Sequence, residues 1–138
     1  MYNFYKYSSD AKSKTAIRKV GVVTFATNAK SVLEKAGYVP EFKNIDVSNL
    51  SDESSFNTVK IISNFADTLK QVVDKNEPSI LSRYLIELSQ SFSSFYNNNK
   101  IIGEQKEKQD ARLYLTYVVG NIIKTGANLL GIEMPDRM

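Results

Sequence analysis

Residues 79–100 read SILSRYLIELSQSFSSFYNNNK and hold the most regular pattern of the chain. Apolar side chains recur there every three or four residues and define one face of a helix: Leu81, Leu85, Leu88, Phe92 and Phe95. Pro78 suits a first helical turn, where its missing N–H costs nothing, and asparagines 97–99 disfavour continuation of the helix. The pattern predicts an amphipathic helix over residues 79–97, with the Phe95 ring in the core.

Three other segments carry the same spacing of apolar residues. One helix is predicted over 108–130, with Gly131 at its end, and another over 52–74, with Ser51 as its N-cap. A fourth is predicted over 19–36. No segment shows sustained alternation of apolar and polar residues bounded by hairpin turns, and the sequence contains no internal repeat. The predicted class is all-α, a single small helical bundle.

The composition fits one soluble domain. The 138 residues are 42% hydrophobic and 24% charged, so residues 1–138 are expected to bury one core, although residues 1–18 do not indicate a conformation. No apolar run approaches the roughly 20 residues that span a bilayer, and the N-terminus lacks the apolar block of a secretion signal. We expect a cytoplasmic protein without a membrane partner.

Residue types that most catalysis needs are absent. The chain has no cysteine and no histidine, which removes the thiolate and imidazole metal ligands and the commonest general base. It contains neither a GxxxxGK[ST] nor a GxGxxG phosphate-binding motif. Glu104 and Glu107 flank a loop of mixed charge and are interpreted as solvated surface. We therefore expect no catalytic residue, no metal site and no cofactor in this chain.

An ordered set of short motifs fills the last sixty or so residues. Its members are Glu77-Pro78, Leu81, Tyr84-Leu85, Leu88, Phe92, Phe95-Tyr96-Asn97, Ala111-Arg112-Leu113, Leu115, Gly126, Leu129-Leu130-Gly131-Ile132 and Pro135-Asp136-Arg137-Met138. In order and spacing the set resembles the C-terminal DALR-type anticodon-binding domain of class I aminoacyl-tRNA synthetases, most closely that of the arginyl enzymes. The match is best over residues 77–138.

Upstream of these motifs the resemblance is thinner. Residues 24–36 are similar to the family's tyrosine- and arginine-bearing helix, but Thr27-Asn28 stands where the family has Ala-Arg, and Phe25 lies near its aromatic position. The HIGH- and KMSKS-type motifs of the family's catalytic domain are absent. The resemblance implies a domain that recognises the anticodon loop of arginine tRNA. It also implies a catalytic domain of the same polypeptide that would use ATP and magnesium.

Six residues are candidates for contact with tRNA. Tyr96 is predicted at the helix end, where its ring could stack on an unpaired base; alternatively it caps the bundle through a hydrogen-bonded hydroxyl. Asn97 could read base edges or bind phosphate. Arg83 and Arg112 come early in their predicted helices and either reach backbone phosphates or are solvated. Arg137 and Met138 are candidates through the family resemblance alone.

A second function fits the same fold. A DALR-like bundle that has lost RNA binding would act as a protein-interaction module, and the modest formal net charge of +3 leaves this alternative open. RNA binding would require Lys and Arg concentrated around Tyr96 and the C-terminus, whereas the alternative would not. A DNA partner is not expected.

Overall fold

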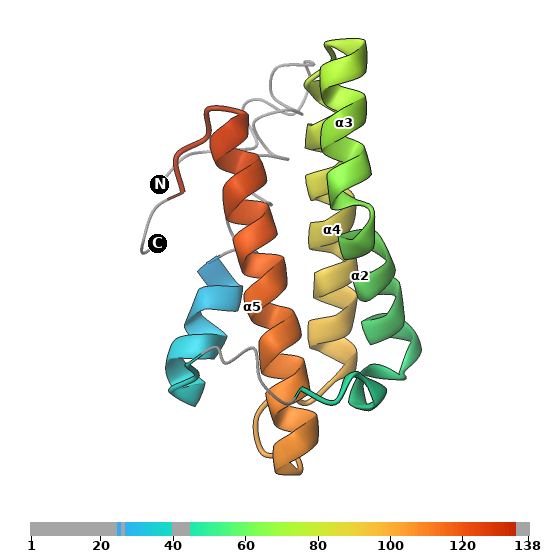
Figure 1. The fold of residues 1–138 in the computed structure, drawn as a ribbon. Helices are drawn as coiled ribbons and strands as arrows, with labels where there is room; N and C mark the ends of the chain where they lie inside the picture. The colour runs from blue at the N-terminus through green and yellow to red at the C-terminus, as the bar shows by residue number, and fades with distance from the viewer. Residues whose placement is uncertain (1–24, 26, 40–44, 135–138) are drawn as a thin grey trace, which may run out of the picture.

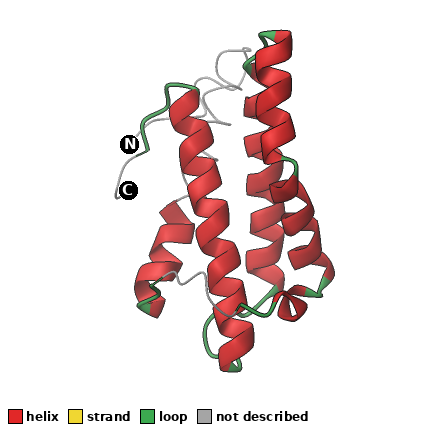
Figure 2. Ribbon diagram, in the orientation of Figure 1, coloured by secondary structure: helices red, strands yellow, loops and turns green. Residues whose placement is uncertain are grey.

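The computed structural model describes residues 25, 27–39 and 45–134, and every regular element in these ranges is helical (Figure 2). The elements are a helical segment over 27–36, the 3-10 helix η2 (Val47–Leu50), and the α-helices α2 (Glu53–Ser63), α3 (Phe65–Lys75), α4 (Ser79–Asn98) and α5 (Lys106–Leu129). The prediction of an all-α bundle is confirmed. No helix in the described ranges has the length and apolar character needed to cross a membrane.

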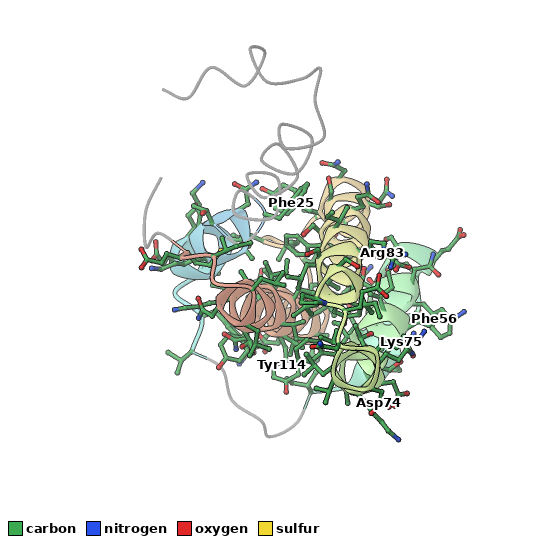
Figure 3. The ribbon with its side chains drawn as sticks, turned by 90° about the horizontal axis from the view of Figure 1, so that it is seen from above. Phe25, Phe56, Asp74, Lys75, Arg83 and Tyr114 are labelled. Carbon is green, nitrogen blue, oxygen red and sulfur yellow. The ribbon has the colours of Figure 1, made fainter. Side chains whose placement is uncertain are left out.

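Helices α4 and α5 are antiparallel and form the centre of the bundle (Figure 1). Helices α2 and α3 follow one another along one side of α4, and the segment 27–36 lies against the other side of α5, as the view from above also shows (Figure 3). A Cβ atom added to Gly120 of α5 would lie 3.5 Å from the Cβ atom of Ala29, an ordinary packing distance. Helix α5 therefore has neighbours on two sides.

The core lies between α4 and α5. Phe92 is 1% exposed and Phe95 is fully buried, with their ring centroids 5.9 Å apart, which confirms the core position predicted for Phe95. The other fully buried large apolar side chains of these two helices are Leu85, Leu88, Leu113, Val119 and Ile123. Their burial removes the apolar face of α4 from water and supplies most of the driving force for folding.

The helix predicted over 52–74 is two helices, and this prediction is corrected. Asn64 ends α2 with its N–H bonded to the carbonyl of Ile61 at 3.1 Å, three residues back instead of four. The hydroxyl of Tyr84, on α4, donates to the same carbonyl at 2.9 Å, and its ring stacks on Phe65 with centroids 5.6 Å apart. A contact from another helix thus accompanies the break, and local sequence spacing gives no indication of it.

The other predicted helix ends agree with the structure to within one or two residues, which is the usual uncertainty of such boundaries. One cap is corrected: Asp52, not Ser51, is the N-cap of α2, because its carboxylate accepts the N–H of Ser55 at 3.0 Å. Gly131 has a φ of +73° and follows α5 as predicted. Residues 19–24 of the fourth predicted helix, and residues 1–18, lie outside the described ranges.

Candidate nucleic-acid interface

Tyr96 presents an aromatic ring at the C-terminal end of α4. The residue is 47% exposed, and its ring leans on the buried ring of Phe92 one turn earlier, with centroids 6.3 Å apart. Its hydroxyl makes no hydrogen bond with any residue in the described ranges. The bonded hydroxyl that the capping interpretation requires is therefore not formed there. One side of the ring is supported by protein, and the residue remains open to a partner.

The three asparagines after Tyr96 differ in environment. Asn97 is exposed, and Asn98 is exposed with its amide 3.2 Å from the hydroxyl of Ser94. Asn99 is turned inward and leaves the helical conformation, with φ −126° and ψ 129°. Only the first two are therefore positioned to offer amide groups to a ligand.

Asn99 joins three helices through its side-chain amide. Its Nδ2 atom donates to Asp52 Oδ2 at 3.1 Å, to Ser54 Oγ at 2.8 Å and to the carbonyl of Phe95 at 3.0 Å. Its Oδ1 atom accepts from Arg112 Nη2 at 2.6 Å. We call these five residues the Asn99 cluster. From sequence, asparagines 97–99 were expected to stop the helix and Asn97 to contact RNA, and this structural role of Asn99 was missed.

Arg112 is buried, with an exposed fraction of 5%. Besides its bond to Asn99, its Nη1 atom donates to the carbonyl of Lys100 at 2.7 Å, and the carboxylate of Glu104 lies 3.9 Å from Nη1. Both interpretations of Arg112 from sequence, phosphate contact and solvated surface, assumed an accessible guanidinium, and the structure instead directs it to protein groups. A direct phosphate contact by Arg112 is therefore not proposed.

The burial of Arg112 has a simple geometric cause. Thr116, Val119 and Ile123 follow it at helical spacings of four, seven and eleven residues, and all three are fully buried. The stripe that begins at Arg112 therefore faces inward along its whole length. This spacing was present in the sequence, and a second buried face on the helix 108–130 could have been inferred from it.

Asp52 is held ionised by its neighbours. Partial burial by itself would raise the pKa of this carboxyl, but hydrogen bonds from Ser55, Ser54 and Asn99 outweigh burial and keep the pKa well below its ordinary value. At neutral pH the Asn99 cluster therefore contains one carboxylate and one guanidinium, bridged by the amide of Asn99.

A polar groove of about 430 Å³ separates the first turns of α2 from the last turns of α4. Its lining consists of Asp52, Glu53, Ser54, Asn57, Ser94, Asn98 and Asn99. Tyr96 is two residues from both Ser94 and Asn98, about 200° around the helix, so its ring belongs to a different face of α4. The groove offers amides and hydroxyls, and its two carboxylates disfavour phosphate.

Charge around the end of α4 is mixed. Lys100, Lys106 and Lys108 come just after α4 or in the first turn of α5, together with Glu104 and Glu107. In the described segment after Tyr96, three lysines are thus accompanied by two glutamates, and Arg137 near the C-terminus lies outside the described residues. Binding of a polyanion at this end would rest on a few lysines only.

The remaining candidates do not join Tyr96. Arg83 is highly exposed, pairs with Glu77 at 3.6 Å, and lies about 20 Å from Tyr96 along α4, the rise of 13 helical residues. Arg137 and Met138 lie outside the described residues. In the described ranges, therefore, Tyr96 and Asn97 are neighbours at the end of α4, Arg112 is bonded to Asn99 and Lys100 just beyond them, and Arg83 lies at the other end of α4.

Comparisons with known proteins agree with this fold. A family model described as the DALR anticodon binding domain matches residues 25–138. The arginine–tRNA ligase of Halothermothrix orenii is 43% identical over 110 residues, which make up 79% of this chain and 19% of that protein. Arginine–tRNA ligase 1 of Bacillus cereus is 42% identical over 89 residues, 64% of this chain and 16% of that protein.

A solved structure also matches. The arginyl-tRNA synthetase of Thermus thermophilus superposes with a TM-score of 0.75 at 23% identity, over 85% of this chain and 20% of that chain. At this identity the likeness is one of fold. The chain spans less than a quarter of the length of each of these three proteins.

Proposed function

Since this chain belongs to the family of DALR anticodon-binding domains, we propose that it binds the anticodon loop of arginine tRNA and positions that tRNA for aminoacylation. The observation that carries the proposal is the half-exposed ring of Tyr96, supported from behind by Phe92 and followed directly by the exposed amide of Asn97. An unpaired base can stack on such a ring while a neighbouring amide bonds its edge.

The proposal assigns stacking most of the binding energy at this end of the bundle. A base stacked on an aromatic ring contributes roughly 1–3 kcal/mol and needs no basic surface. Lys100, Lys106 and Lys108 would add a few phosphate contacts, each offset by nearby acids. Arg83 would meet a different part of the tRNA, and Arg137 and Met138 are kept as candidates on the family resemblance.

Catalysis would belong to another part of the polypeptide. The relatives are named as arginine–tRNA ligases, and such a ligase would activate arginine with ATP, with magnesium at the phosphates, in a catalytic domain joined to this one. No residue of this chain is assigned to ATP or to the metal. We propose the catalytic domain and arginine tRNA as the two partners of this bundle, in the cytoplasm.

The alternative, a protein-interaction module without RNA binding, is not favoured. All three proteins compared above carry the name of an arginine–tRNA ligase or synthetase. The mixed charge near Tyr96 is compatible with tRNA binding that has a weak electrostatic contribution, and equally with the alternative. Measurement of tRNA binding therefore separates the two functions.

The test uses the 138-residue chain in filter-binding titrations with arginine tRNA and a non-cognate tRNA. Tyr96→Ala should weaken binding of arginine tRNA by about 1–3 kcal/mol with little change in the melting temperature, because a half-exposed ring is lost. Tyr96→Phe should keep most of the affinity, since stacking needs the ring and not the hydroxyl.

A matched control is available on α2. Phe56 is 61% exposed and points away from α4 and α5 (Figure 3), so Phe56→Ala removes a comparable exposed ring from another face. Its affinity for arginine tRNA should equal that of the wild type. Equal affinity of Tyr96→Ala and the wild type would contradict the stacking role, and so would an equal loss in Phe56→Ala.

A further inference from the structure

We propose that Arg112 is a positioning residue for tRNA binding: it fixes the last turn of α4, which carries Tyr96 and Asn97, through Asn99, and does not itself contact RNA. The inference rests on the proposed function. It replaces both interpretations of this arginine from sequence, phosphate contact and solvated surface, and it assigns to the Asn99 cluster a role in the geometry of the binding site.

The guanidinium holds the two residues at which the chain leaves α4. Its Nη2 atom bonds Asn99 Oδ1 at 2.6 Å, and its Nη1 atom bonds the carbonyl of Lys100 at 2.7 Å. These are charge-assisted hydrogen bonds to consecutive residues, and the planar guanidinium fixes them in direction as well as distance. Carbonyls beyond a helix end lack a partner within the helix, so Arg112 supplies one.

Asn99 transmits this constraint to Tyr96. The backbone N–H and the side-chain Nδ2 of Asn99 both lie 3.0 Å from the carbonyl oxygen of Phe95. That carbonyl belongs to the peptide group that joins Phe95 to Tyr96. The path from Arg112 to the backbone of Tyr96 therefore consists of two consecutive hydrogen-bonded contacts and one peptide bond.

The other side of Asn99 is anchored by Asp52. Nδ2 faces the oxygens of Asp52 and Ser54, and Oδ1 faces Arg112, so the amide has one orientation in which every contact joins a donor to an acceptor. Rotating the amide by 180° would place its oxygen against the Asp52 carboxylate, acceptor against acceptor, and its nitrogen against the Arg112 guanidinium, donor against donor. The end of α4 is thereby fixed to both α2 and α5.

Burial separates this role from a phosphate contact. Arg112 is nearly inaccessible, with Glu104 3.9 Å away, so a phosphate could reach the guanidinium only after the bonds to Asn99 and Lys100 had broken. Its Nε atom is buried without a hydrogen-bond partner. Burying a guanidinium with one unsatisfied nitrogen costs free energy that an apolar side chain would not. This cost favours a role for Arg112 that depends on the directions of its hydrogen bonds.

The test measures the affinity of the 138-residue chain for arginine tRNA at several salt concentrations, in the wild type, Arg112→Lys, Arg112→Met and Asn99→Ala. Each variant should bind roughly tenfold more weakly, the effect of one lost charge-assisted hydrogen bond. The plot of log affinity against log salt should keep the wild-type slope in all three. Combining Arg112→Met with Asn99→Ala should weaken binding little more than either alone.

A direct phosphate contact predicts a different pattern. Arg112→Lys would then keep most of the affinity, because the positive charge remains, and Arg112→Met would reduce the magnitude of the salt slope by about 0.7–0.9. Either result overturns the inference. Arg83→Ala serves as the control for charge removal at an exposed arginine, whose side chain can leave the protein without opening the core.

One further measurement keeps the inference testable if a variant is unstable or RNA does not bind. Amide NMR shifts of Tyr96 and Asn97 in the free chain should move in Asn99→Ala, a half-buried position, while those of α3 stay in place. Unmoved shifts at Tyr96 and Asn97 overturn the inference. Absence of tRNA binding by the wild type overturns the proposed function, whereas wild-type affinity in Arg112→Lys and Asn99→Ala overturns the inference alone.

Discussion

Gly126→Ala is expected to destabilise the bundle, although alanine is the better helix former. A Cβ atom added at Gly126 would lie 2.6 Å from Leu85 Cδ2, 3.0 Å from Cδ1 and 3.2 Å from Cγ. Leu85 is almost fully buried, and rotating its end cannot relieve a contact that extends to Cγ. Helix propensity would gain about 1 kcal/mol, whereas overpacking a core costs about 1–3 kcal/mol.

The expected net effect is a loss of about 1 kcal/mol, which lowers the melting temperature by about 4 °C for a domain of this size. This effect is measured by thermal unfolding of Gly126→Ala, Leu85→Val and the double variant. Because valine frees the volume that the added alanine methyl group needs, the double variant should lose less stability than the two single variants together. Gly120→Ala is the matched control: its added Cβ meets Ala29 at 3.5 Å, so it should be neutral or stabilising. A rise in melting temperature for Gly126→Ala would refute the reasoning.

Two other predictions concern the contacts that fix α2. Tyr84→Phe removes the hydrogen bond to the Ile61 carbonyl and keeps the ring against Phe65, so urea unfolding should show a loss of about 1 kcal/mol; an unchanged midpoint would mean that the bond contributes nothing. The pKa of Asp52 is lower in the folded chain than its ordinary 3.8, so its contribution to stability is present above pH 3.8 and is lost as the pH falls below that value. Asp52→Asn should therefore show a weaker loss of stability in acid than the wild type, and parallel curves would contradict this.

Much of the fold was predictable because its signals are local. The face of α4 is set by apolar residues at helical spacing, and the end of α5 by Gly131, both visible in a single segment. The break at Asn64 was not predictable in this way, because it coincides with a hydrogen bond from Tyr84, twenty or more residues away. Gly126 was readable as a weak helix position, but not as the site of close approach to Leu85.

In the candidate site, too, the features set by local sequence were predicted and those set by contacts between helices were not. Tyr96 and Asn97 were identified from their place at a helix end, and the structure leaves both exposed. The inward turn of Asn99 depends on Asp52 and Arg112, which lie at the start of α2 and in α5, so it does not follow from local sequence. The burial of Arg112, by contrast, could have been inferred from the helical spacing of Val119 and Ile123. Arg83 was a candidate because it comes early in its predicted helix, and the length of α4 separates it from Tyr96.

The most direct measurement is the affinity of the 138-residue chain for an RNA hairpin that carries the anticodon stem and loop of arginine tRNA, compared with the same stem closed by an unrelated loop. Stacking on Tyr96 and bonding by Asn97 depend on unpaired bases, so the loop replacement should weaken binding at least tenfold, and Tyr96→Ala should remove most of this difference. Equal affinity for the two hairpins, or a preference that persists in Tyr96→Ala, would contradict anticodon-loop recognition at the end of α4.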